Sequence, residues 1–258
     1  GVDYGTSSCR AVIVDLTGGS EVATAVYAFN GGEDGVITDD NDPNLARQLP
    51  SEYRQGLITT VKQVLAESGI RPEEVVGIGT DATGSTPLPL DQDGHPLAEN
   101  FPDDPSAMAW LWKDHTAHAE AAEITALAQK RGEPFLSKCG GAYSSEWLWS
   151  KILHCTRTSP DVQNAAATWI ECSDYIPALI TGTLGDPTRT ICAAGHKGMW
   201  NPEWGGWPSD DFLTLLNPQL ARIRATLGNP VPTSTKMGGL SAEFAEATGL
   251  RAGTPVAG

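Results

Sequence analysis

The start of the chain constrains its fold most, because it encodes tight turns between short strands. The first residues read as the end of a strand, Gly5 opens a turn, and a second strand follows over residues 11–15. The glycine pair at 18–19 turns the chain again, and residues 21–29 read as a third strand. We therefore predict two consecutive β-hairpins at the N-terminal end of a sheet.

The tip of the first hairpin has a composition that suits phosphate. Gly5 lets the backbone approach a ligand closely, and the N–H groups and hydroxyls of Thr6, Ser7 and Ser8 can donate hydrogen bonds. Asp3 can hold a magnesium ion through water. The spacing alone is equally typical of an ordinary hydroxyl-rich β-turn, so both interpretations stay open at this point.

The rest of the chain alternates helical and strand patterns. The clearest helix covers residues 51–68, where apolar residues recur every three or four positions, and a buried strand follows over 75–80. Residues 30–44 are acidic and rich in glycine, and we expect a polar loop there. Further helices are predicted at residues 116–131, 144–156, 173–181, 209–216 and 241–248. This order is typical of an α/β domain.

Length and charge set the outer limits. The 258 residues are long for one simple domain and short for two, so we expect one large domain with insertions. A net charge of −15 argues against nucleic acid and anionic membranes as partners. No apolar run approaches the roughly 20 residues of a membrane-spanning helix.

Cysteine and histidine spacing indicates neither disulfides nor zinc. The five cysteines are scattered and never occur as C-x-x-C, which is typical of reduced thiols in a cytosolic protein. His115 and His118 are one helical turn apart and His154 precedes Cys155, but none of these pairs has a zinc-site spacing.

Five blocks along the chain carry a resemblance to a known family. They are residues 3–10 (DYGTSSCR), 79–86 (GTDATGST), 111–117 (LWKDHTA), 140–147 (GGAYSSEW) and 194–197 (AGHK). The first block is shared by sugar kinases, actin and chaperone ATPases, whereas the last three are far more specific. In this order they resemble the N-terminal domain of the FGGY-type carbohydrate kinases, and within that family the ribulokinase group.

The resemblance implies both a fold and a reaction. The fold would be ribonuclease-H-like, of the actin-like ATPase superfamily: a mixed α/β sheet flanked by helices, with helical insertions. Residues 1–258 would form the N-terminal lobe, which closes on sugar and ATP with a C-terminal lobe absent from this chain. The reaction would be transfer of the γ-phosphate of Mg·ATP to L-ribulose, giving L-ribulose 5-phosphate in arabinose catabolism in the cytoplasm.

Residues of the first block resemble the family's phosphate side. Asp3 matches the family's carboxylate that lies on the magnesium side of the site, and residues 5–8 match the loop that lies against the ATP phosphates. Arg10, the first cation after the loop, could reach back towards the transferred phosphate. The alternative for Arg10 is an ion pair with a local carboxylate on the face of its strand.

Residues of the second and fifth blocks resemble the sugar side. Thr83 and Gly84 fall where the family makes substrate contacts, and Gly84 can offer only its backbone and space for a ketose. Lys197 matches a substrate-contacting lysine of ribulokinases and can donate to two neighbouring hydroxyls. The alternatives are a glycine that allows a bend and a solvated lysine.

The third block has two interpretations. Trp112 can stack on a sugar, and Asp114 can accept from a hydroxyl; equally, Trp112 can belong to the core and Asp114 can cap the helix that starts near residue 116. Glu146 has the same ambiguity at the start of its helix. The other tryptophans are expected to pack the insertion against the sheet: Trp147, Trp149, Trp200, Trp204 and Trp207.

No residue reads as the general base that takes the proton from the sugar hydroxyl. In FGGY kinases this base is an aspartate at the start of the C-terminal lobe, shortly after a glycine-rich strand end. Residues 253–258 resemble the strand that leads into that segment, so we expect the base beyond Gly258 and no catalytic residue within this chain. The chain alone is therefore expected to be inactive.

Three other interpretations remain open. They are a kinase for D-ribulose or D-xylulose, a non-catalytic sugar-binding half, and an actin-like ATPase with a protein partner. The face that would meet a second lobe is expected to be apolar, so the chain could form a homo-oligomer.

Overall fold

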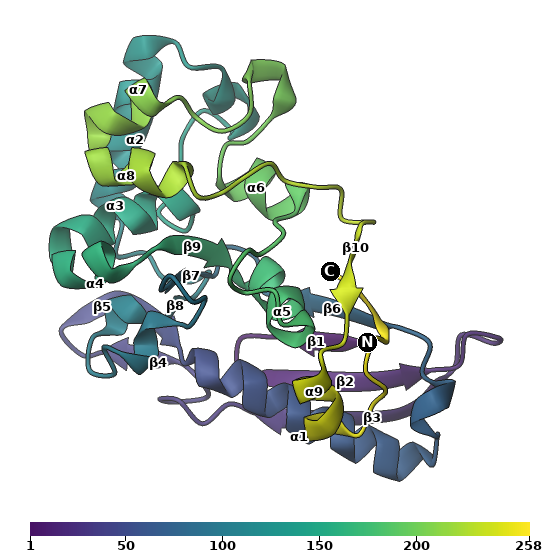
Figure 1. Ribbon diagram of the computed structural model, residues 1–258. Coiled ribbons are helices and arrows are strands. Elements are labelled where there is room, and N and C mark those ends of the chain that lie inside the picture. The colour runs from purple at the N-terminus through teal and green to yellow at the C-terminus, as the bar shows by residue number, and fades with distance from the viewer.

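The computed structural model describes residues 1–258 and shows a mixed β-sheet joined to a second, mostly helical part (Figure 1). The main sheet has six strands in the order β10-β11-β6-β1-β2-β3. Their bounds are β1 (Val2–Tyr4), β2 (Ser8–Val14), β3 (Glu21–Ala28), β6 (Ile78–Ala82), β10 (Lys236–Gly239) and β11 (Pro255–Ala257). The two predicted hairpins are confirmed, because β2 pairs antiparallel with both β1 and β3.

The strand directions make the sheet mixed, as expected. β1 runs parallel to β6, and β6 runs parallel to β11, whereas β10 pairs antiparallel with β11. Parallel neighbours end at the same edge of a sheet, so the segments that follow β1 and β6 leave it side by side. This places the two glycine-containing segments predicted to bind phosphate and sugar next to each other.

Helices α1 (Pro50–Ser68), α5 (Cys172–Thr181) and α9 (Ala242–Thr248) complete this part of the fold. α1 packs on β2 and β3, α5 packs on β6, β10 and β11, and α9 lies against α1. Tyr53 of α1 and Tyr175 of α5 meet with ring centroids 6.2 Å apart, so both helices bury their apolar faces in one core. The predicted helix at 51–68 is confirmed, and Gly69 ends it with a φ of 65°, which glycine adopts readily.

A second core of 25 buried residues holds the inserted segments together. Two small sheets adjoin it, one of β4 (Ile37–Asp39), β5 (Asp42–Gln48) and β8 (Ala109–Trp110), the other of β7 (Pro87–Leu90) and β9 (Thr168–Glu171). The helices are α2 (His118–Arg131), α3 (Leu148–Thr158), α4 (Pro160–Ala165), α6 (Ile191–Lys197), α7 (Asp210–Leu216) and α8 (Pro218–Arg224). Short 3₁₀ helices lie at Pro72–Glu74, Leu97–Glu99, Pro105–Ala107, Pro134–Lys138 and Pro202–Trp204. The tryptophans expected to pack the insertion against the sheet pack instead within this second core, where Trp149 is fully buried.

Three predicted elements differ from the structure. The polar loop expected at 30–44 contains β4 and the first residues of β5. These two strands pair antiparallel with each other, so the acidic stretch forms a sheet without packing in a core. The strand expected at 75–80 lies instead at 78–82, and Val76 is 64% exposed. The helix expected from 144 begins at Leu148, after a turn.

No helix in the structure combines the length and the apolar character needed to cross a membrane.

Candidate functional site

The tip of the first hairpin presents free backbone donors. The N–H of Gly5 donates to the carbonyl of Ser8 at 2.9 Å, and the side-chain amide of Gln48 donates to the carbonyls of Gly5 and Thr6 at 3.3 and 2.6 Å. The N–H groups of Thr6 and Ser7 have no partner in the protein. The carbonyls of Gly5 and Thr6 are thus occupied while the N–H groups of Thr6 and Ser7 remain available, which suits a phosphate.

Two exposed carboxylates lie on neighbouring strands beside this loop. Asp3 of β1 stands opposite Asp81 of β6 and opposite Arg10 of β2. All three residues are exposed, and the local ion pair considered for Arg10 is not formed. Magnesium prefers one or two carboxylates together with water, so Asp3 and Asp81 fit a hydrated ion. Asp81 was not predicted as a site residue, although it lies in the second block of the resemblance.

The segment after β6 lies directly against Lys197. The N–H of Thr83 donates to the carbonyl of Tyr4 at 3.0 Å, which ties this segment to the end of β1. A Cβ added to Gly84 would lie 3.0 Å from Nζ of Lys197 and 3.3 Å from its Cε. Ser85 has a φ of 59°, a left-handed conformation that non-glycine residues seldom adopt. Thr83, Gly84 and Lys197 therefore come together from distant parts of the chain.

Lys197 is the last residue of α6, and its surroundings fix that helix end. The hydroxyl of Tyr143 donates to the carbonyl of Lys197 at 2.5 Å. The rings of Trp147 and His196 lie 5.1 Å apart, and burial together with the charge of Lys197 lowers the pKa of His196. Aromatic side chains thus pack around the end of α6 that carries the ammonium group.

Trp112 connects the sugar-side block to the phosphate loop. Its indole N–H donates to the hydroxyl of Thr6 at 3.0 Å, and the residue is 43% exposed. The hydrogen bond fixes the orientation of the indole and leaves much of the ring in solvent. Trp112 is therefore not a core residue, and its ring is open to a ligand.

Asp114 is corrected from a sugar contact to a structural carboxylate. It is fully buried, forms an ion pair with Arg47, and accepts from the N–H of Ala46 at 2.8 Å. Its other oxygen accepts from the N–H and the hydroxyl of Thr116 at 3.2 and 2.6 Å. Asp114 does not cap α2 either, because Ala117 holds that position without a side-chain bond. Protein donors engage both of its oxygens.

Two buried charges behind the site were not predicted. Nζ of Lys151 donates to three carbonyls, those of Ser85 at 2.8 Å, Trp110 at 3.1 Å and Leu111 at 2.9 Å. Glu171 accepts from the N–H of Thr86 at 2.9 Å, and its second oxygen has no partner. Burial lowers the pKa of Lys151 and raises that of Glu171. The sequence signal for Lys151 was a lysine inside the apolar pattern of α3. Glu171 had no such signal, because β9, the strand that carries it, was not predicted.

A third buried carboxylate anchors α6. Asp174 of α5 is 2% exposed and accepts from the N–H and the hydroxyl of Thr190 at 3.1 and 2.8 Å. Thr190 immediately precedes α6, so this contact ties the helix that carries Lys197 to α5. Burial raises the pKa of Asp174 to about 6.

The histidines make ordinary polar contacts. Nδ1 of His154 lies 3.0 Å from a carboxylate oxygen of Glu120, and Nδ1 of His115 lies 3.1 Å from the hydroxyl of Ser145. No group of three or more histidine, cysteine, aspartate or glutamate side chains could hold a metal ion.

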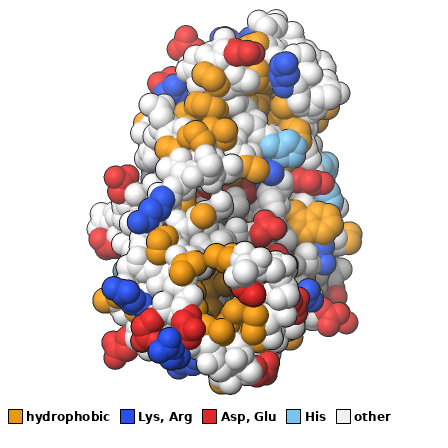
Figure 2. Space-filling model, turned by 90° about the vertical axis from the view of Figure 1, so that its right-hand side faces the viewer, with side chains coloured by type: hydrophobic (Ala, Val, Ile, Leu, Met, Phe, Trp, Pro, Cys, Tyr) orange, Lys and Arg blue, Asp and Glu red, His pale blue; other side chains and the backbone are white.

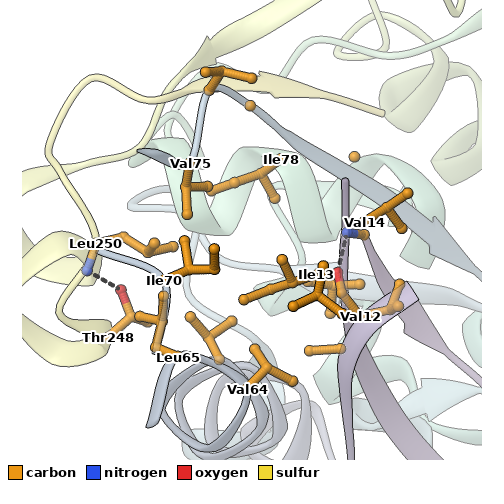
Figure 3. A pocket seen from close by; sticks show the side chains of 18 of the residues that line it. Val12, Ile13, Val14, Val64, Leu65, Ile70, Val75, Ile78, Thr248 and Leu250 are labelled. Carbon is orange, nitrogen blue, oxygen red and sulfur yellow. Dashed lines mark hydrogen bonds between the residues drawn. The ribbon is translucent and has the colours of Figure 1, made fainter. Parts of the chain in front are cut away.

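A large apolar cleft lies away from these residues. It has a volume of about 780 Å³ and opens at the start of β1, between β2, β6, α1 and the end of α9. Figure 2 shows a hollow framed by hydrophobic side chains, and Figure 3 shows the aliphatic side chains of Ile13, Val64, Ile70 and Val75 pointing into such a cleft. A sugar needs several polar partners, so this apolar cleft does not suit one.

Comparison with curated proteins gives consistent relatives. The chain is 40% identical to the ribulokinase of Shouchella clausii over 265 residues, covering 100% of this chain and 46% of the relative. It is 36% identical to the ribulokinase of Mycolicibacterium smegmatis over 269 residues, again covering 100% of this chain and 46% of the relative. The chain thus spans about half the length of the curated relatives it matches.

Solved structures share the fold. The xylulose kinase of Rhodospirillum rubrum matches with a TM-score of 0.78 and 25% identity, covering 100% of this chain and 47% of that one. A Plasmodium falciparum glycerol kinase with ADP matches with a TM-score of 0.75 and 15% identity, covering 100% of this chain and 47% of that one. These likenesses confirm the expected actin-like ATPase fold. Residues 1–258 match the N-terminal domain of the FGGY carbohydrate kinases, and the chain belongs to that family.

Proposed function

We propose that this chain is the N-terminal lobe of a kinase that transfers the γ-phosphoryl group of ATP to L-ribulose, giving L-ribulose 5-phosphate. The observation that carries the proposal is the contact between Gly84 and Lys197, beside a loop with free N–H groups. The ribulokinase names of relatives up to 40% identical support L-ribulose as the substrate.

Each side of the site has a distinct role in this proposal. The ammonium of Lys197 donates to sugar hydroxyls, the backbone of Thr83 and Gly84 borders the sugar, and the ring of Trp112 covers its apolar face. The N–H groups of the hairpin loop hold ATP phosphates, and Arg10 neutralises charge on the transferred group. Asp3, together with Asp81, would hold magnesium through water, and the ion would supply further neutralising charge.

We further propose that no carboxylate of this chain acts as the general base. The three buried carboxylates behind the sugar residues already have protein partners. Asp114 is engaged by Arg47, Asp174 accepts from Thr190, and Glu171 accepts from a backbone N–H. The exposed pair, Asp3 and Asp81, lies on the side proposed for the metal.

The base is instead proposed to be an aspartate that follows Gly258 in a longer protein. β11 ends at Ala257 and runs parallel to β6, so a segment that continues past Gly258 leaves the sheet at the same edge as Thr83 and Gly84. Such a segment would start beside the proposed sugar site. The relatives are about twice as long as this chain, which leaves room for this aspartate in a second lobe.

A turnover assay tests this division of roles. We expect the chain alone to release no ADP in response to any pentulose, because a positioned base contributes roughly 10²–10⁴ in rate. The longer protein that contains the chain should be active and prefer L-ribulose to D-ribulose and D-xylulose. Lys197→Ala in the longer protein should raise KM for the sugar, whereas Lys130→Ala, an exposed lysine on α2, should not. Full activity of the chain alone, or a preference for another pentulose, would contradict the proposal.

A further inference from the structure

We propose that Lys151 is a positioning residue of the sugar site, whose ammonium holds the segment of Gly84 and the segment of Trp112 at a fixed separation. The inference depends on the proposed function in one respect, namely that these two segments face the sugar.

Among the side-chain hydrogen bonds, only those of Lys151 join the segment of Gly84 to the segment of Trp112. The ammonium has three donors, and all three are used, on the carbonyls of Ser85, Trp110 and Leu111 at 2.8, 3.1 and 2.9 Å. Ser85 directly follows Gly84, and Leu111 directly precedes Trp112. The side chain is fully buried and comes from α3 in the second core, so one rigid helix sets the position of both segments.

The segment after Gly84 is also held from its other side. The carboxylate of Glu171 accepts from the N–H of Thr86 at 2.9 Å, and the N–H of Cys172 donates to the carbonyl of Thr86 at 2.9 Å. A cation thus holds the carbonyl of Ser85 and an anion holds the N–H of the next residue. This arrangement maintains the left-handed φ of 59° at Ser85, a conformation that persists only where surrounding contacts enforce it.

Lys151 and Glu171 form no direct ion pair, but burial raises the pKa of Glu171 and the positive charge of Lys151 opposes that rise. Glu171 is 6% exposed, and one of its oxygens has no hydrogen-bond partner. Removing the lysine alone would leave this carboxylate buried without its counter-charge, which can unfold a protein for reasons unrelated to the sugar. The informative variant therefore removes both charges together, as Lys151→Met with Glu171→Gln.

The control is Ile152→Ala, at the next position of the same helix. Ile152 is fully buried in the second core, so this change also weakens the packing of α3, but it leaves the three carbonyls with their donor. The first readout is amide hydrogen exchange in segments 83–86 and 110–112. The second is calorimetric titration with L-ribulose.

We expect exchange in both segments to be roughly tenfold faster in the double variant than in Ile152→Ala, as loss of hydrogen bonds to a charged group implies. We also expect L-ribulose affinity to fall roughly tenfold in the double variant and to stay at the wild-type value in the control. Equal exchange in the two variants would overturn the inference, as would faster exchange with unchanged affinity. If the wild-type chain binds no pentulose, the exchange comparison alone decides whether Lys151 holds the segments, and the substrate preference of the longer protein decides the proposed function.

Discussion

Replacing Gly84 with valine is expected to weaken pentulose binding while leaving the fold intact. A Cβ at this position would lie 3.0 Å from Nζ of Lys197, which is 0.4 Å short of the 3.4 Å at which ordinary contact begins. The φ of Gly84 is not in the left-handed region, so its backbone accepts a side chain. In Gly84→Ala, the flexible end of the lysine can move by this small amount, and we expect affinity within about threefold of wild type.

Valine is different because it adds two γ carbons about 1.5 Å beyond Cβ. Two of the three staggered rotamers of valine point a methyl towards Lys197, and in these the ammonium must retreat by about a bond length; only the rotamer that points Hβ at Lys197 avoids this. A hydrogen bond from a charged donor contributes about 1.5–3 kcal/mol, so its loss corresponds to roughly 10- to 150-fold in Kd.

The assay is calorimetric titration with L-ribulose alongside thermal unfolding. Gly185→Val is the matched control, because Gly185 is exposed, has no atom within 4 Å of an added Cβ, and does not need a positive φ. The Tm of Gly84→Val should stay near that of the control. Unchanged affinity in Gly84→Val, or equal losses in the alanine and valine variants, would refute the placement of the sugar against Lys197.

Other changes separate structural from ligand-facing residues. Asp114→Ala should lower the free energy of unfolding in urea by about 3–5 kcal/mol, because it leaves the buried charge of Arg47 without its carboxylate, and it should leave the sugar affinity of the folded protein unchanged. The pKa of Asp174, raised to about 6 by burial, means that the folded state binds a proton more tightly than the unfolded state. Its contribution to the free energy of unfolding should therefore fall by about 2–3 kcal/mol as the pH rises from about 4 to 6, and Asp174→Asn should remove this dependence in urea titrations at both pH values. Trp112→Phe keeps an aromatic ring but loses the 3.0 Å bond to Thr6, so hydrogen exchange in the hairpin loop should rise while sugar affinity stays within about threefold; unchanged exchange would contradict this role of the indole.

Local sequence patterns predicted the helices with clear ends. Gly69 ends α1 and Gly249 ends α9, each with a positive φ. Ser209 and Ser241 cap α7 and α9 by accepting from an N–H three residues on. These features depend on residues close in sequence, which is why they could be read without the structure.

Elements that depend on distant partners were missed. β4 and the first residues of β5 lie in the stretch 30–44 that was predicted as a polar loop, and β5 is completed by pairing with β8, far along the chain. The same holds for the site: Lys197 could be predicted from the family resemblance, but its contact with Gly84 is a tertiary feature. Lys151 and Glu171 looked like isolated charges, and only folding shows that they hold the backbone on either side of Ser85.

Calorimetric titration of this chain with L-ribulose, D-ribulose and D-xylulose tests the central claim most directly. We expect weak binding that is selective for L-ribulose and is abolished by Lys197→Ala but not by Lys130→Ala. Binding of L-ribulose that is unaffected by Lys197→Ala, or tighter binding of another pentulose, would contradict a ribulose site between Gly84 and Lys197.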